Sequence, residues 1–344
     1  MSRARARELI LVVGVGRSGT SVLTGVLGQL GVHIPQPEVR ADATNPRGFG
    51  EPRWVVDFHS RLLRQRRVTV NDARPAAWES TAAAAADPAV NAALLEWLRA
   101  QVGQADAVVV KDPRTVWLLP LWMGCAAELG IAPSFVTMLR HPAETVASAR
   151  KSYGTWQSEA SRAAAWVNVA LETERLTRGA RRAFLRYDDL LADWSREVAR
   201  VGAQLDLPLL RDLDRSAFPE VDGFVDPSLH RNRATWEDAN VPAPLRELAE
   251  EAWQRLQPLA AAGGDTPEVR AALDEARASF QTLYAEAEQI AQSSITAAKP
   301  RRGDGSGRPA PAPPASLRRR VARRVPIRYK RILRRAVRSL RRPT

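Results

Sequence analysis

The chain has 344 residues, with 51 Lys+Arg against 38 Asp+Glu and a net charge of +13. Such an excess is typical of proteins that bind nucleic acid or membranes, but here it is local. Residues 299–344 hold 17 of the basic residues and one acid, which leaves 34 basic and 37 acidic residues, a net charge of −3, in residues 1–298. A near-neutral body argues against a surface that wraps nucleic acid.

The cysteine, the histidines and the apolar runs of the sequence indicate which compartment and which kinds of site are possible. The single Cys125 excludes an intramolecular disulfide and a multi-cysteine metal site, and it fits a reducing, cytoplasmic compartment. The four histidines lack the spacing of zinc sites, so we expect no metal. The apolar run 9–16 follows a basic start, as in a signal peptide, but Glu8 and Arg17 bound it and it is too short to cross a bilayer. We therefore expect it to be a buried strand.

In chain order, apolar strands alternate with helices. The expected strands are 9–15, 107–110, 134–139 and 183–187, and the expected helices are 18–30, 52–66, 89–102, 117–129, one from 142, and 158–178. Asp87-Pro88 reads as an N-cap followed by proline at the first helical position. Apolar strands separated by helices of ten or more residues predict an α/β fold with a central parallel sheet and helices on both faces. Helix and loop follow residue 206, with a long helix near 267–293.

Three segments are expected: a body of residues 1–296, a disordered Pro/Gly-rich linker of residues 297–316, and a basic amphipathic tail of residues 317–344. In the tail, apolar residues recur at helical spacing among arginines. One interpretation is peripheral attachment to an anionic membrane surface at the inner face of the cell membrane. The alternatives are a solvated arginine-rich tail and a nonspecific polyanion contact. We expect no specific nucleic-acid partner.

A glycine-rich loop, Gly14-Val15-Gly16-Arg17-Ser18-Gly19-Thr20-Ser21, joins the first strand to the first helix. Backbone N–H groups and a helix N-terminus converge on one anion in this context, so the loop predicts a phosphate site; the alternative is a tight turn with glycines for packing. The expected phosphate-binding residues are Gly16, Arg17, Ser18, Gly19, Thr20 and Ser21. A Walker A loop would carry lysine where Thr20 stands, which disfavours ATP or GTP hydrolysis.

A second pair of residues follows the third expected strand. Arg140 ends strand 134–139, and Ser148 lies eight residues later in the next helix. A strand-end guanidinium and a helical hydroxyl can hold a second phosphate, distinct from the one on the glycine-rich loop. The alternative for Arg140 is an ordinary surface ion pair.

Together, GRSGTS and LRHPAETVASAR resemble the sulfotransferases that use 3′-phosphoadenosine 5′-phosphosulfate (PAPS), bacterial members above all. The segments 45–51 (NPRGFGE), 111–114 (KDPR) and 186–190 (RYDDL) are also similar to motifs of that family. The resemblance covers about residues 9–235 and implies a P-loop-like sulfotransferase fold, with the first loop on the 5′-phosphosulfate and Arg140 and Ser148 on the 3′-phosphate. It implies transfer of a sulfuryl group to a hydroxyl or amine of a glycan, lipid or small molecule. Arg17 departs from the lysine of many cytosolic members.

Sulfuryl transfer builds charge on the bridging oxygen and the leaving phosphate, so fixed donors there lower the barrier. Arg17 and the loop amides are expected to supply them, and this chemistry requires no metal. Lys111 and Arg114 end a strand, at the edge where open α/β sheets bind ligands. They are expected to hold the sulfuryl group or an anionic acceptor; an ion pair with Asp112 is the alternative.

The acceptor needs a general base. Glu51 is the first candidate, because the segment 45–51 follows the first helix, where it can overhang the donor. Asp57 and His59 are the alternatives on the next helix, against the interpretation that they are an exposed acid and an ordinary polar histidine. A weaker expectation is that Arg231 and Arg233 close over the nucleotide.

Two other functions fit part of the pattern. One is an ATP-dependent P-loop kinase of small molecules, which would need Mg²⁺, and the other is a non-catalytic nucleotide-binding protein with a degenerate site. The combination of Arg17 with Arg140 and Ser148 argues against degeneration. Five tryptophans lie near the expected ligand edge, where a few can stack on sugar rings and most are expected to pack in the core: Trp54, Trp78, Trp117, Trp122 and Trp156.

Overall fold

The computed structural model describes residues 7–42, 44–154, 156–226 and 234–298. The chain divides into two units, residues 1–291 and 292–344. The first unit holds every strand and helix discussed below. Of the second, the described part is α14 (Gln292–Ala298). The expected tail and the expected linker from residue 299 onward lie outside the described residues, as do Arg231 and Arg233.

Four parallel strands form the sheet, in the order β2-β1-β3-β4. They are β1 (Glu8–Gly14), β2 (Ala107–Lys111), β3 (Ser134–Leu139) and β4 (Arg181–Arg186). In register, Val12 of β1 pairs with Lys111 on one side and with Val136 on the other. The connection from β1 leads to β2 on one side, and the connection from β2 crosses back to β3 on the other side of β1. This change of direction opens a crevice beyond the carboxyl ends of these strands.

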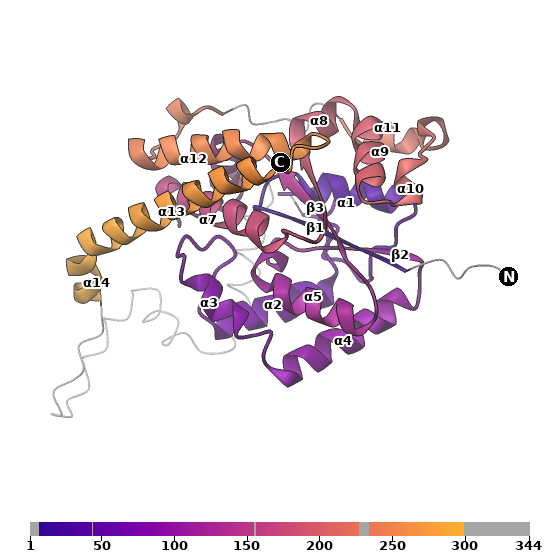
Figure 1. Ribbon diagram of the computed structural model, residues 1–344, viewed down its shortest axis with the longest axis horizontal. Helices are drawn as coiled ribbons and strands as arrows, with labels where there is room; N and C mark the ends of the chain where they lie inside the picture. Colours follow the sequence, from indigo (N-terminus) through magenta and orange to yellow (C-terminus); the bar gives the residue numbers. More distant parts are fainter. Residues whose placement is uncertain (1–6, 43, 155, 227–233, 299–344) are drawn as a thin grey trace, which may run out of the picture. The chain divides into compact units, whose positions relative to one another are not determined.

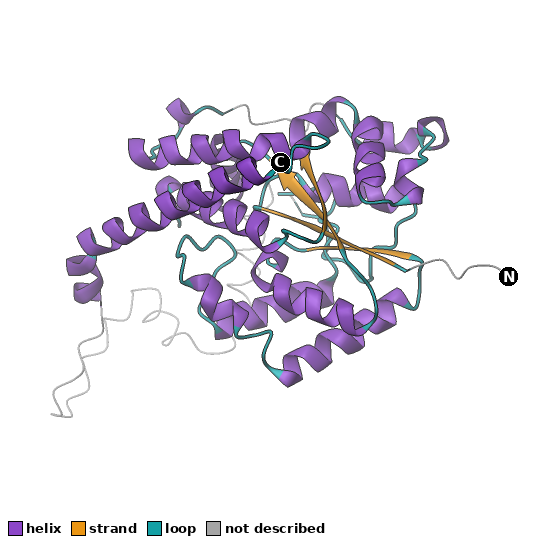
Figure 2. Cartoon of the chain, viewed as in Figure 1, coloured by secondary structure: helices purple, strands orange, loops and turns teal. Residues whose placement is uncertain are grey.

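Alternate residues of each strand face two separate apolar cores. In β1, Leu9, Leu11 and Val13 enter one core, and Ile10 and Val12 enter the other. The predicted α/β fold with helices on both faces is therefore confirmed, and Figures 1 and 2 show the strands running between two groups of helices. None of the described helices combines the length and apolarity that crossing a membrane requires.

The helices divide between the two cores. The first core is covered by α2 (Arg53–Gln65), α3 (Ala77–Ala82), α4 (Pro88–Val102), α5 (Leu119–Glu128), α7 (Glu159–Leu176), α12 (Ala243–Leu256) and α13 (Pro267–Ile290). The second is covered by α1 (Thr20–Gln29), α8 (Tyr187–Ala192), α9 (Trp194–Gln204), α10 (Pro208–Arg211) and α11 (Pro219–Phe224). The α6 helix (Pro142–Tyr153) follows β3, and short 3-10 helices span Thr115–Leu118, Arg215–Ala217, Trp236–Asp238 and Gln257–Ala260.

Local chemistry explains where several elements begin. The α4 helix begins as expected, because the Asp87 carboxylate accepts a hydrogen bond from the Ala89 N–H at 2.9 Å and Pro88 has no N–H to satisfy. The α1 helix begins at Thr20, two residues later than expected, because Gly19 has a φ of +96° and cannot continue a helix. The helix expected at 117–129 begins with a 3-10 turn and becomes α5 only at Leu119.

Candidate active site at the carboxyl edge of the sheet

The loops after β1, β2 and β3 surround a cavity of about 530 Å³. Its walls come from the glycine-rich loop 14–21, the irregular segment 38–52, the segment 111–114 and the α6 helix. The predicted site residues that line it are Gly16, Arg17, Gly19, Thr20, Ser21, Glu51, Lys111, Arg140 and Ser148. Ser18 is not among the lining residues, because its side chain is fully buried beneath the loop.

The glycine-rich loop has the backbone that an anion site needs. Gly14 has a φ of +136°, and a Cβ there would lie 2.7 Å from the Met138 carbonyl oxygen. Arg17 has a φ of +74°, a conformation rare for a residue with a side chain and one that clusters at functional sites. Among the described residues, no side chain caps the N-terminus of α1, so the N–H groups of Thr20 and Ser21 in its first turn are available to an anion.

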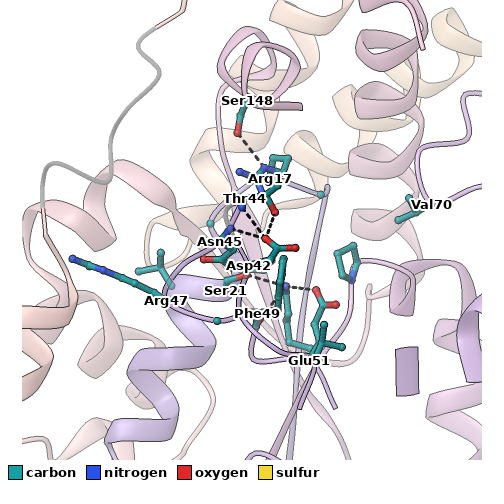
Figure 3. A pocket seen from close by; sticks show the side chains of 18 of the residues that line it. Arg17, Ser21, Asp42, Thr44, Asn45, Arg47, Phe49, Glu51, Val70 and Ser148 are labelled. Atoms are coloured by element: carbon teal, nitrogen blue, oxygen red, sulfur yellow. Dashed lines mark hydrogen bonds and ion pairs between the residues drawn. The ribbon is translucent and has the colours of Figure 1, made fainter. Parts of the chain in front are cut away.

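The two predicted phosphate motifs meet in the cavity. The Arg17 Nε donates a hydrogen bond to the Ser148 Oγ at 3.1 Å, as Figure 3 shows, and the Arg140 Nη1 donates to the Arg17 carbonyl at 3.3 Å. Arg140 is buried, pairs with Glu144 at 2.9 Å, and lies 4.4 Å from the centre of the Tyr187 ring. Arg17 and Arg140, which follow two different strands, therefore share one cluster.

Lys111 forms a buried salt bridge with Glu51. The Lys111 Nζ lies 2.6 Å from the Glu51 Oε1, 3.0 Å from the Ser21 Oγ and 3.2 Å from the Phe49 carbonyl oxygen. These contacts occupy every N–H of the ammonium group. Lys111 thus connects the irregular segment 38–52 to the glycine-rich loop.

The two alternative bases lie outside the cavity lining. The Asp57 side chain is 64% exposed and pairs with Arg53 on its own helix. His59 is completely buried, with its Nδ1 2.8 Å from the Asp112 Oδ2 and its Nε2 accepting the Trp122 indole N–H at 2.9 Å. Because both ring nitrogens are engaged, His59 cannot take a proton from a molecule in the cavity.

Asp112 and Arg114 form the ion pair that the sequence left as an alternative. The Arg114 Nη1 lies 2.7 Å from the Asp112 Oδ1. Burial alone would raise the pKa of the Asp112 carboxyl, but the interactions with His59, followed by those with Arg114, outweigh burial and hold this pKa at about 2. Arg114 also lines the cavity, with its side chain 27% exposed.

Asp42 is a cavity residue that sequence reasoning missed. Its Oδ1 accepts hydrogen bonds from the Thr44 N–H at 2.8 Å, the Thr44 hydroxyl at 2.6 Å and the Asn45 N–H at 3.1 Å. The bonds from Thr44, ahead of the other contributions, lower the pKa of this carboxyl. Asp42 lies in a segment without periodicity, so no pattern marks it.

Only one of the five singled-out tryptophans lines this cavity. Trp156 does so and is 68% exposed, whereas Trp54, Trp78, Trp117 and Trp122 pack in the first core. Across the described ranges, no group of three or more His, Cys, Asp or Glu side chains is arranged to hold a metal ion.

Comparisons with known proteins identify the family of the chain. Residues 10–212, more than half of the chain, match the model of the sulfotransferase family. A similar solved structure is the sulfotransferase domain from the Synechococcus PCC 7002 olefin synthase, at 17% identity and a TM-score of 0.39, covering 73% of this chain and 96% of that one. No curated protein matches the chain. Because the family model matches more than half of the chain, the chain belongs to the sulfotransferase family and is a sulfotransferase.

Proposed function

We propose that this sulfotransferase takes its sulfuryl group from PAPS and transfers it to a hydroxyl or amine of a glycan, lipid or small molecule. The observation that carries the proposal is the hydrogen bond of 3.1 Å between Arg17 and Ser148, with Arg140 on the Arg17 carbonyl. A donor with one anionic end would need only the glycine-rich loop. A nucleotide with a 5′-phosphosulfate and a 3′-phosphate uses both cationic groups.

The residues of the cavity divide the chemistry between them. The α1 N-terminus and Arg17 stabilise the charge that grows on the oxygen bridging sulfur and phosphorus as that S–O bond breaks. Glu51 takes the proton from the acceptor hydroxyl as the new O–S bond forms, leaving 3′,5′-adenosine bisphosphate and a sulfate ester. Lys111, at 2.6 Å, fixes the Glu51 carboxylate for this step.

Calorimetric titration tests the donor. We expect 3′,5′-adenosine bisphosphate to bind tenfold to about a hundredfold more tightly than 5′-AMP or ATP, since a charge-assisted hydrogen bond is worth roughly 1.5–3 kcal/mol. Arg140→Ala should remove this preference. Arg64→Ala is the matched control, because Arg64 is exposed on α2, away from the cavity lining. A wild-type protein that ignores the 3′-phosphate would overturn the proposal.

We propose in addition that the basic tail, residues 317–344, brings the enzyme to an anionic membrane surface. The support is its sequence, in which apolar residues at helical spacing alternate with arginines.

A further inference from the structure

A chain of buried hydrogen bonds runs from the first core to the cavity. The Trp122 indole N–H donates to the His59 Nε2 at 2.9 Å, which fixes the tautomer so that the His59 Nδ1–H donates to the Asp112 Oδ2 at 2.8 Å. The Asp112 Oδ1 then accepts from Arg114, from its Nη1 at 2.7 Å and from its backbone N–H at 3.1 Å. His59, Asp112 and Trp122 are fully buried, and Arg114 is the end of the chain that reaches the cavity.

Arg114 keeps hydrogen-bond donors to spare, whereas Lys111 keeps none. A guanidinium carries N–H groups on all of its nitrogens. Within the part of the chain that the structure describes, Nη1 is the side-chain nitrogen of Arg114 with a partner, and Nε and Nη2 have none. The Lys111 ammonium divides its protons among Ser21, Phe49 and Glu51. Of the two cations at the carboxyl end of β2, Arg114 is thus the one with N–H groups left to bind a further anion.

The segment that carries Arg114 is docked on the glycine-rich loop. Lys111 donates to Ser21 at one end of that loop. A Cβ added to Gly16, near the other end, would lie 4.0 Å from the Pro113 Cβ, which is ordinary van der Waals contact. The guanidinium of Arg114 therefore projects from a segment in direct contact with the loop that binds the phosphosulfate in the proposed function.

We propose that Arg114 binds the sulfuryl group of the donor, and that Asp112 and His59 are positioning residues that hold its guanidinium in place. This assignment rests on PAPS as the donor. A planar guanidinium with free N–H groups matches the oxygens of a sulfuryl group, and the buried carboxylate prevents it from turning away. Donors fixed before the reaction need no reorganisation as the S–O bond to the leaving phosphate breaks.

The comparison of PAPS with 3′,5′-adenosine bisphosphate tests Arg114 without any acceptor, because the two ligands differ by the sulfuryl group. By calorimetry, we expect Arg114→Ala to lower the affinity for PAPS by tenfold to about a hundredfold and to leave the bisphosphate within about twofold. The Arg64→Ala control should change neither. If Arg114→Ala lowers the affinity for both ligands equally, or leaves the preference for PAPS unchanged, the assignment is wrong. It is also wrong if Lys111→Met abolishes this preference while Arg114→Ala preserves it. Failure of the bisphosphate to bind wild type would instead refute the donor itself.

A double-mutant cycle tests the positioning role of His59. We expect His59→Leu to lower the preference for PAPS by roughly threefold to tenfold in the wild-type background and to have no effect on it in Arg114→Ala. His59→Gln should restore the preference, because its amide can accept from Trp122 and donate to Asp112. Asp112→Asn, which keeps the shape of the side chain, should also lower the preference for PAPS. This variant replaces His59→Leu in the test if His59→Leu fails to fold. A loss caused by His59→Leu that persists without Arg114 would refute positioning.

Discussion

The salt bridge with Lys111 fixes one oxygen of the Glu51 carboxylate and leaves the other able to accept a proton. Its Oε1 is held by Lys111 at 2.6 Å, while no hydrogen bond reaches its Oε2 from the described ranges. One oxygen is thus fixed by a salt bridge and the other is left to accept a proton. Because both side chains are almost fully buried, each charge depends on the other for compensation.

Removing Lys111 alone should therefore lower the free energy of unfolding more than removing both charges of the pair. We expect Lys111→Met to lower the free energy of unfolding by about 3–5 kcal/mol, because it leaves the Glu51 charge buried and uncompensated. The double variant Lys111→Met/Glu51→Gln should recover most of that loss. Urea unfolding of the three proteins measures the difference, and equal stabilities of single and double variants would contradict it.

Asp112 should make the free energy of unfolding depend on pH. Its pKa is lowered from the ordinary 3.8 to about 2, so the folded state holds the charged form more strongly than the unfolded chain does. The resulting stability, on the order of 2 kcal/mol, is fully present above pH 3.8 and is lost as the pH falls toward 2. Denaturant unfolding across this window should show a steeper decline for wild type than for Asp112→Asn. Parallel declines would exclude the effect.

Among the elements, the turn into α1 is the most constrained. Gly19 has a φ of +96°, and a Cβ there would collide with the Tyr187 ring. Gly19→Ala should abolish binding of 3′,5′-adenosine bisphosphate, because either the turn or Tyr187 must move. Gly31, just after α1, is the matched control: its φ is +88° but nothing lies within 4 Å of an added Cβ. Gly31→Ala should lower stability by about 1 kcal/mol and leave binding unchanged; calorimetry and thermal unfolding separate the two.

Apolar runs and helix caps predict most helices and strands. Where an element begins with charged residues, its first residue is predicted wrongly. The β4 strand begins at Arg181, two residues before the apolar run at 183. Arg182 can enter the sheet because its guanidinium pairs with Glu174 at 3.1 Å and with Asp265 at 2.8 Å. These partners lie in other elements, so no local pattern reveals them.

The same limit applies to the site. The meeting of Arg17 with Arg140 and Ser148 follows from parallel strands whose carboxyl ends share one edge of the sheet. The salt bridge of Lys111 with Glu51 depends on the path of segment 38–52, which has no periodicity. The bond between His59 and Asp112 joins a helix to a loop 53 residues away. Sequence alone therefore finds the residues that end strands and misses the partners that orient them.

At the scale of the whole molecule, the excess of positive charge and the candidate active site lie in different parts of the chain. Residues 1–298 carry a net charge of −3, and two cations of the cavity pair with acids: Arg140 with Glu144, and Arg114 with Asp112. Residues 299–344 carry +16. In the proposed function, binding of an anionic nucleotide therefore depends on local geometry, whereas the proposed attraction to an anionic membrane surface depends on the charge of the tail.

Deleting residues 299–344 should separate these two properties. With roughly 1 kcal/mol per basic residue near an anionic surface, the full chain should sediment with vesicles that contain phosphatidylserine and not with pure phosphatidylcholine vesicles. The shortened chain should stay in the supernatant in both cases while binding 3′,5′-adenosine bisphosphate as tightly as the full chain. Raising the salt concentration should release the full chain, since screening weakens attraction between exposed charges. Sedimentation that survives the deletion would place the membrane contact on the body instead.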